Sequence, residues 1–132
     1  MRSILLDTNA YTAVLAGDER VLEALARADT TYMSVVTVGE LHAGFRGGSR
    51  FIINREQLAS FLSKPTVQTL DVGPESAEIY GQLDDTLRRA GTPIPSNMLW
   101  LAAQAIQTGS VVISFNDHFR EIPGVRLWEI SG

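Results

Sequence analysis

The stretch Ile4-Leu5-Leu6-Asp7-Thr8-Asn9 decides the fold of this chain. Its first three residues form an unbroken apolar run, typical of a strand buried on both faces in a parallel sheet. The next apolar residues, Tyr11, Val14 and Leu15, recur at helical spacing. Asp7 therefore lies where a strand gives way to a helix, at the edge of an open parallel sheet where ligands bind. A role as a turn residue or helix N-cap explains Asp7 equally well.

Strand-like and helix-like patterns alternate along the rest of the chain. Apolar and β-branched runs predict strands, in order, at 31–36, 67–72, 111–113 and 125–130. Amphipathic spacing and terminating glycines predict the helices, in order, at 9–15, 19–28, 37–46, 54–64, 74–90 and 96–108. Connections of this length allow right-handed crossovers, so the chain is predicted to be an α/β protein with helices on both faces of a parallel sheet.

Polar residues at the helix starts have expected structural roles. Thr37 and Glu40 have the spacing of a capping box, which would explain Glu40 without any chemistry. The caps expected for three other helices are Asp18, Asn54, and Ser96 or Asn97.

Length and composition limit the classes of protein to consider. The 132 residues fit one domain, 1–132, and a hydrophobic fraction of 45% fits a globular core. No apolar run is as long as a membrane span, and there is no cysteine, so a cytoplasmic protein without disulfides is expected. A net charge of −4 argues against coating nucleic acid by bulk charge, but it allows an enzyme that handles RNA at a local site.

Oxygen-bearing side chains follow the strands at the places where each strand ends. Asp7 and the pair Asn116-Asp117 come after the strands at 4–6 and 111–113, and Glu40 begins the helix after the second strand. If these strands are neighbours, the side chains meet at one rim of the sheet. Carboxylate and amide oxygens suit Mg²⁺ or Mn²⁺, ions that support phosphodiester cleavage.

Other kinds of site have less support. No glycine-rich phosphate loop is present, and two histidines are too few for a zinc site without cysteines. His42 is expected to point away from Glu40, and His118 to pack within a loop. A phospho-acceptor receiver domain also places acids at strand ends, but Asp7 stands alone and Lys64 lies far from the last strand. A purely structural α/β module is the remaining alternative.

Four stretches in order carry a resemblance to a known family. They are Leu5-Leu6-Asp7-Thr8-Asn9, Ser34-Val35-Val36-Thr37-Val38-Gly39-Glu40-Leu41, residues 94–103, and Ile113-Ser114-Phe115-Asn116-Asp117-His118-Phe119 with the segment 122–125. Together they resemble the PIN-domain family, and within it the VapC-type toxins of bacterial toxin–antitoxin pairs. The resemblance implies a three-layer α/β/α sandwich around a mostly parallel sheet of four to five strands.

The resemblance also implies an activity and a set of site residues. It implies a Mg²⁺- or Mn²⁺-dependent endoribonuclease whose first two acidic ligands are Asp7 and Glu40. The third acid of the family falls at Met98, which offers only a thioether, and the fourth at Asn116, which keeps a carbonyl oxygen. Asp117 is adjacent to the fourth position and could assist as a ligand.

Two hypotheses follow within this fold. In the first, the chain is a toxin that cleaves an RNA substrate with Asp7, Glu40 and Asn116, is neutralised by a cognate antitoxin protein, and forms a homodimer. In the second, which Met98 favours, it binds its antitoxin or RNA without cutting. The surface expected for the antitoxin includes Tyr11, Val14, Leu15 and the region 45–51, and a place in the core explains each of them equally well.

Overall fold

The computed structural model describes residues 2–129, in which five strands form one sheet. They are β1 (Ser3–Leu6), β2 (Thr30–Ser34), β3 (Val67–Leu70), β4 (Val111–Ile113) and β5 (Arg126–Leu127). The order is β3-β2-β1-β4-β5, and every neighbouring pair is parallel. The predicted parallel sheet is thus confirmed, with β1 at its centre.

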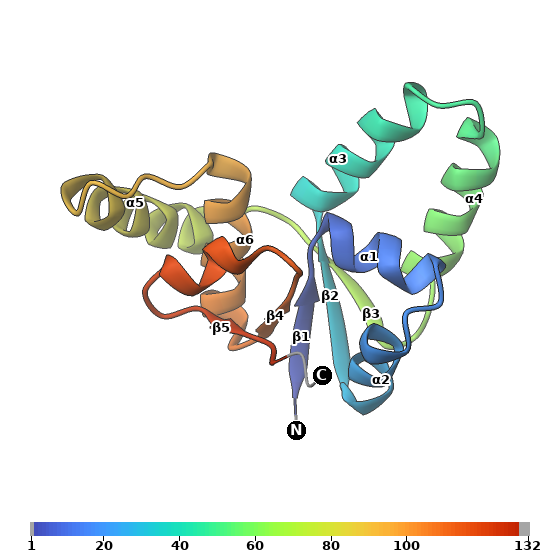
Figure 1. The fold of residues 1–132 in the computed structure, drawn as a ribbon, viewed down its shortest axis with the longest axis horizontal. Helices are drawn as coiled ribbons and strands as arrows, with labels where there is room; N and C mark the ends of the chain where they lie inside the picture. Colours follow the sequence, from blue (N-terminus) through green and yellow to red (C-terminus); the bar gives the residue numbers. More distant parts are fainter. Residues whose placement is uncertain (1, 130–132) are drawn as a thin grey trace.

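Helices cover both faces of the sheet (Figure 1). On one side lie α1 (Thr8–Leu15), α2 (Glu19–Arg27), α3 (Val35–Arg46) and α4 (Phe51–Leu62), and on the other α5 (Pro74–Arg89) and α6 (Ser96–Thr108). Along β1, Ile4 and Leu6 pack into the core under the first group, whereas Leu5 packs into the core under α5 and α6. This alternation explains the unbroken apolar run, because both faces of β1 are buried.

The start of α3 differs from the prediction. The strand expected to reach residue 36 ends at Ser34, whose hydroxyl accepts a hydrogen bond from the backbone N–H of Val36 at 3.1 Å and caps the helix. Thr37 is therefore buried inside the helix, and the predicted capping box with Glu40 is wrong. Ser34, at the end of the strand, caps the helix in place of Thr37, so Glu40 has no capping role.

Other helix and strand boundaries also differ from the predicted ones. Asp18 caps α2 as predicted, but Asn54 lies inside α4, whose N-cap Arg50 makes no side-chain capping bond. Pro95, rather than Ser96 or Asn97, precedes α6 as its N-cap. The third strand ends at Leu70, and the closing strand predicted at 125–130 is observed at Arg126–Leu127, while residue 130 lies outside the described part. None of the described helices is both long and apolar enough to cross a membrane.

Tyr11 belongs to the core rather than to a partner surface, which decides between the two roles that the sequence left open. Its side chain is 1% exposed and its ring meets that of Phe61 edge to face, with centroids 5.2 Å apart. The hydroxyl has no hydrogen-bond partner among the described residues, and burial raises its pKa above the ordinary value. A buried hydroxyl without a partner lowers stability.

We expect Tyr11→Phe to raise the free energy of unfolding by about 1 kcal/mol, because it removes a buried polar group that has no partner. Urea denaturation followed by circular dichroism measures the change. The control is Tyr80→Phe, in which a half-buried ring stacks on Trp100 on the other side of the sheet, and which should change stability little. A loss of stability in Tyr11→Phe would show that the hydroxyl is satisfied in solution.

Candidate active site

A pocket of about 440 Å³ lies at the carboxyl edge of the sheet. It forms where the end of β1 meets the segment after β4 and the first turns of α3 and α6, the upper rim in Figure 1. Its lining includes Asp7, Thr8, Glu40, Asn97, Met98 and Asn116. Because β1 and β4 are parallel neighbours, the predicted residues at their two ends are brought together.

Asp7 is both a helix cap and a member of this pocket. Its Oδ1 accepts a hydrogen bond from the N–H of Ala10 at 3.0 Å, and its Oδ2 accepts one from the hydroxyl of Ser114. The side chain is only 7% exposed. Burial raises the pKa of Asp7 above its ordinary value, and the nearby Glu40 carboxylate raises it further.

Glu40 projects from α3 and is held by two neutral donors. Its Oε1 accepts a hydrogen bond from the hydroxyl of Thr8, and its Oε2 accepts one from the side-chain amide of Asn97, both at 3.1 Å. The donors come from α1 and α6, so three helices fix the position of one carboxylate. These contacts join residues 57 and 32 positions apart in the chain, so the local sequence predicted only a capping role for Asn97 and none for Thr8.

Asn116 and Met98 contact each other on the far wall of the pocket. The Asn116 amide nitrogen lies 3.5 Å from Met98 Sδ, and its Oδ1 accepts a hydrogen bond from the N–H of His118 at 3.1 Å. That second bond caps a short 3-10 helix, Asp117–Glu121. Met98 is 6% exposed, so at the place where the resemblance predicts a third acid the pocket has a buried thioether without charge.

Two other predicted residues lie outside this pocket. The Asp117 carboxylate is 87% exposed and faces Arg120 at 3.5 Å, so the structure does not bring it to Asp7 and Glu40. His118 is also exposed, with Nδ1 2.5 Å from Glu121, so it does not pack within the loop as expected, and it lies outside the pocket of Asp7 and Glu40. Both residues belong to the short 3-10 helix and line a separate hollow beside this pocket.

The acidic set at the site is small. Within residues 2–129, no three His, Cys, Asp or Glu side chains lie close enough together to hold a metal ion. Asp7 and Glu40 supply two carboxylates, and Asn116 supplies an amide oxygen. These donors fit Mg²⁺ or Mn²⁺ in kind, and repulsion between the two carboxylates favours a bound cation, whereas Met98 contributes no suitable ligand.

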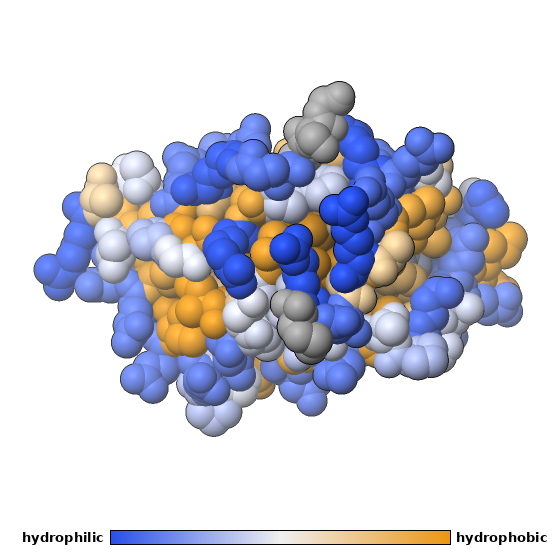
Figure 2. Space-filling view, turned by 90° about the horizontal axis from the view of Figure 1, so that it is seen from below, coloured by the Kyte–Doolittle hydropathy of each residue, from blue (hydrophilic) through white to orange (hydrophobic). Residues whose placement is uncertain are grey.

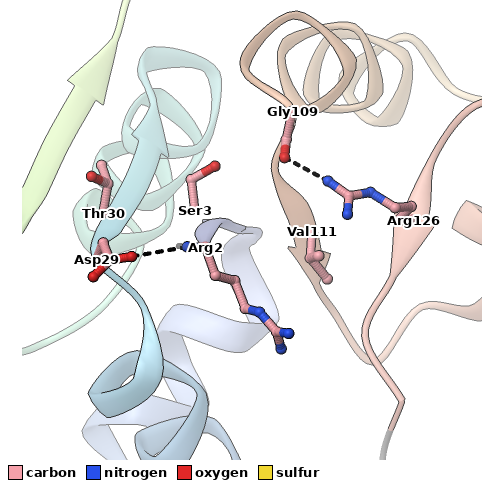
Figure 3. Close-up of a pocket in the computed structure, with 7 residues that line it drawn as sticks. All are labelled: Arg2, Ser3, Asp29, Thr30, Gly109, Val111 and Arg126. Carbon is pink, nitrogen blue, oxygen red and sulfur yellow. Dashed lines mark hydrogen bonds between the residues drawn. The ribbon is translucent and has the colours of Figure 1, made fainter.

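The opposite edge of the sheet has a different character. The pocket in Figure 3 is lined by Arg2, Asp29 and Arg126, among others. There the backbone N–H of Arg2 donates to the Asp29 carboxylate at 2.9 Å, and Arg126 donates to the carbonyl of Gly109 at 2.5 Å. From this side, hydrophilic side chains cross the middle of the molecule between apolar patches (Figure 2). The residues predicted to do chemistry lie at the other edge.

Comparison with known proteins bears on the family and the fold. The sequence profile of the PIN domain matches residues 4–125. Ribonuclease VapC5 of Mycobacterium tuberculosis is 30% identical over 126 residues, which cover 96% of this chain and 92% of that protein. Ribonuclease VapC2 of Haemophilus influenzae is 32% identical over 120 residues, 88% of each chain. DNA-bound VapBC from Salmonella typhimurium contains a chain that is 27% identical and has a TM-score of 0.86, with 97% of this chain and 98% of that one covered.

We expect Asp7→Asn to raise the free energy of unfolding at pH 7. Because burial raises the pKa of Asp7 above 3.8, the folded chain binds the proton more tightly than the unfolded chain. The free energy of unfolding therefore falls as the pH rises from 3.8 through the pKa of Asp7 in the folded chain. The uncharged amide of Asp7→Asn avoids that loss. Asparagine can still cap α1 and can donate to Ser114.

Urea denaturation in chelator at several pH values measures this effect. The gain from Asp7→Asn should shrink as the pH falls below 3.8, where both states carry the proton. Asp85→Asn is the control, because that carboxylate is 63% exposed and pairs only with Arg89 on the surface. A lower stability of Asp7→Asn at pH 7 would mean that the hydrogen bonds to the carboxylate outweigh its desolvation.

Proposed function

Because this chain belongs to the PIN-domain family, we propose that it is the toxin of a toxin–antitoxin pair and acts as an endoribonuclease. Its sequence relatives are named ribonucleases, and its structural neighbours include toxin–antitoxin complexes. The observation that supports the proposal most directly is the meeting of Asp7, Glu40 and Asn116 in one pocket at the carboxyl edge of the sheet.

In this proposal Asp7, Glu40 and Asn116 hold a divalent cation, Mg²⁺ or Mn²⁺. When bound, the ion would supply a nucleophilic water and neutralise charge on the phosphodiester. The protein orients the ligands beforehand: the Ala10 N–H and Ser114 fix Asp7, while Thr8 and Asn97 fix Glu40. Such positioning matters because small displacements of catalytic groups reduce rates strongly.

The rival function is a protein of the same fold that binds antitoxin or RNA without cutting. One observation favours it: Met98 stands at the third acidic position and contacts Asn116, so the pocket holds two carboxylates rather than three or four. Fewer negative charges weaken the attraction for a divalent cation. Restoring an acid at residue 98 separates the two functions.

We expect Met98→Asp to lower the Mn²⁺ or Mg²⁺ concentration needed for half-maximal RNA cleavage by about tenfold or more. Residues that only support metal ligands already change metal affinity by about 10–100-fold, and a new carboxylate ligand acts directly. Cleavage of a labelled RNA pool with metal, against a chelator control, measures the effect. Asp7→Asn and Glu40→Gln should abolish cleavage in either background.

The outcomes of that experiment distinguish the two functions. Metal-dependent cleavage by the chain as given supports the ribonuclease, with Asn116 as the third ligand. Cleavage by Met98→Asp alone supports the rival function for the native sequence. Cleavage that survives Asp7→Asn, or that continues in chelator, contradicts the roles proposed here.

We propose that the antitoxin docks on a groove between α1 and α4. The groove encloses about 440 Å³, and its lining includes Val14, Leu15, Ile53 and Phe61. Leu15 and Ile53 are each 47% exposed, and the neighbouring Ile52 is 68% exposed. Apolar side chains clustered on a surface are typical of a protein-binding site. The homodimer implied by the resemblance stays a prediction, which analytical ultracentrifugation tests.

We expect Leu15→Glu and Ile53→Glu each to weaken antitoxin binding by tenfold or more, because a charge would be buried in an apolar interface. Co-expression with the protein encoded beside this chain, followed by calorimetry of the purified pair, measures the loss. Val72→Glu is the matched control, since Val72 is exposed at 39% but lies outside the groove. Equal binding by all three variants would place the antitoxin elsewhere.

A further inference from the structure

A second hollow opens directly beside the candidate active site. It measures about 740 Å³ and shares Asn9 and Asn116 with the first pocket. Its other walls come from Phe115 and the 3-10 helix, including His118 and Arg120. A substrate whose phosphodiester lies at Asp7 and Glu40 would therefore place its neighbouring groups in this hollow.

Phe115 is the unusual member of the hollow. It is 36% exposed, and no other Phe, Tyr or Trp among residues 2–129 is exposed to that extent. The sequence pattern alone indicated no role for it. The partly exposed ring beside the candidate site offers an apolar surface that a flat ligand group can cover.

The ring is held in place rather than loosely exposed. The backbone N–H of Phe115 donates to Asn9 Oδ1 at 3.2 Å, and the ring meets the Trp128 ring edge to face at 5.6 Å. The guanidinium of Arg20 lies 5.4 Å from the ring centre and is itself paired with Asp18 at 2.8 Å. These contacts hold the Phe115 ring in position before a ligand binds, so less conformational entropy is lost on binding.

The charges around the hollow fit a base better than a phosphate. Arg120, the one arginine that lines the hollow, is opposed by Asp117 at 3.5 Å, and His118 Nδ1 lies 2.5 Å from Glu121. Phosphate sites need net positive charge or converging donors. Unpaired nucleobases instead stack on exposed aromatic side chains, and their polar edges can bond to groups on the rim.

We propose that this hollow is a nucleobase subsite, in which Phe115 contacts one unpaired base of single-stranded RNA next to the phosphodiester that is cut. The proposal rests on the ribonuclease function and adds a specificity-determining residue to it. A base paired in a duplex cannot reach the ring, so the subsite selects single-stranded segments.

The test measures RNA binding in a background that leaves the RNA whole. Fluorescence anisotropy follows a labelled single-stranded RNA decamer with the Asp7→Asn chain in Mg²⁺, and a gel checks that the RNA stays intact. Adding Phe115→Leu should weaken binding by about 5- to 100-fold, the range for loss of one base–aromatic stack. Phe115→Trp keeps a ring and should bind like the parent chain, which excludes a folding defect as the cause.

Phe51→Leu is the matched control. It also removes a ring that lies under an arginine, with Arg46 5.0 Å from the ring centre, but at the start of α4 and outside both site pockets. It should leave RNA binding unchanged. The subsite would be overturned if Phe115→Leu and the parent chain bound RNA with equal affinity, or if Phe115→Leu and Phe51→Leu lost affinity equally. It would also be overturned if the parent chain bound no RNA.

A cleavage assay with native Asp7 separates this proposal from the ribonuclease function. Phe115→Leu should raise KM and leave kcat nearly unchanged, as expected when uniform binding is lost. Cleavage with an unchanged KM would overturn the subsite while the ribonuclease stands. Binding to RNA that depends on Phe115, without any cleavage by the native chain, would support the subsite and overturn the ribonuclease.

Discussion

The position of Asp7 is the constraint on which the rest of the site depends. β1 lies at the centre of the sheet and pairs in parallel with both β2 and β4, so the end of β1 lies beside the ends of both neighbours. At that point a single carboxylate caps α1 through the N–H of Ala10 and binds the hydroxyl of Ser114 after β4. The two structural bonds fix the same oxygens that face the pocket. Capping and chemistry, which appear as alternatives in the sequence, therefore coincide in one residue.

The fold could be predicted because each of its layers leaves a local pattern. Apolar runs mark the central strands, and helices with one apolar face mark the outer layers. The errors occur where two residues compete for one structural role. Ser34 and Thr37 can both cap a helix, but Thr37 is fully buried within α3, whereas Ser34 caps that helix. Local sequence contains no information on that choice, because it depends on tertiary packing.

The candidate site residues also differ in how far the local sequence could predict them. Asp7, Glu40 and Asn116 could be found from strand ends and from the family pattern. The donors that hold them, Ser114, Thr8 and Asn97, could not be assigned, since each contact joins segments that are far apart in the chain. The exposed direction of the Asp117 side chain depends on the 3-10 helix that Asn116 caps, a feature that a turn prediction does not resolve.

Met98 changes the balance between stability and cation binding at this edge. Met98 is 6% exposed and lines the same pocket as Asp7, so a carboxylate there would be added to a site where burial and the nearby Glu40 already disfavour the charged form of Asp7. The thioether avoids that repulsion, packs against the core under α5 and α6, and accepts a contact from the Asn116 amide. The pocket is consequently more stable without an ion than a pocket with three or four acids would be. In the proposed metal site, Met98 also attracts a divalent cation less than a carboxylate would, so one residue both stabilises the fold and weakens the proposed ion binding.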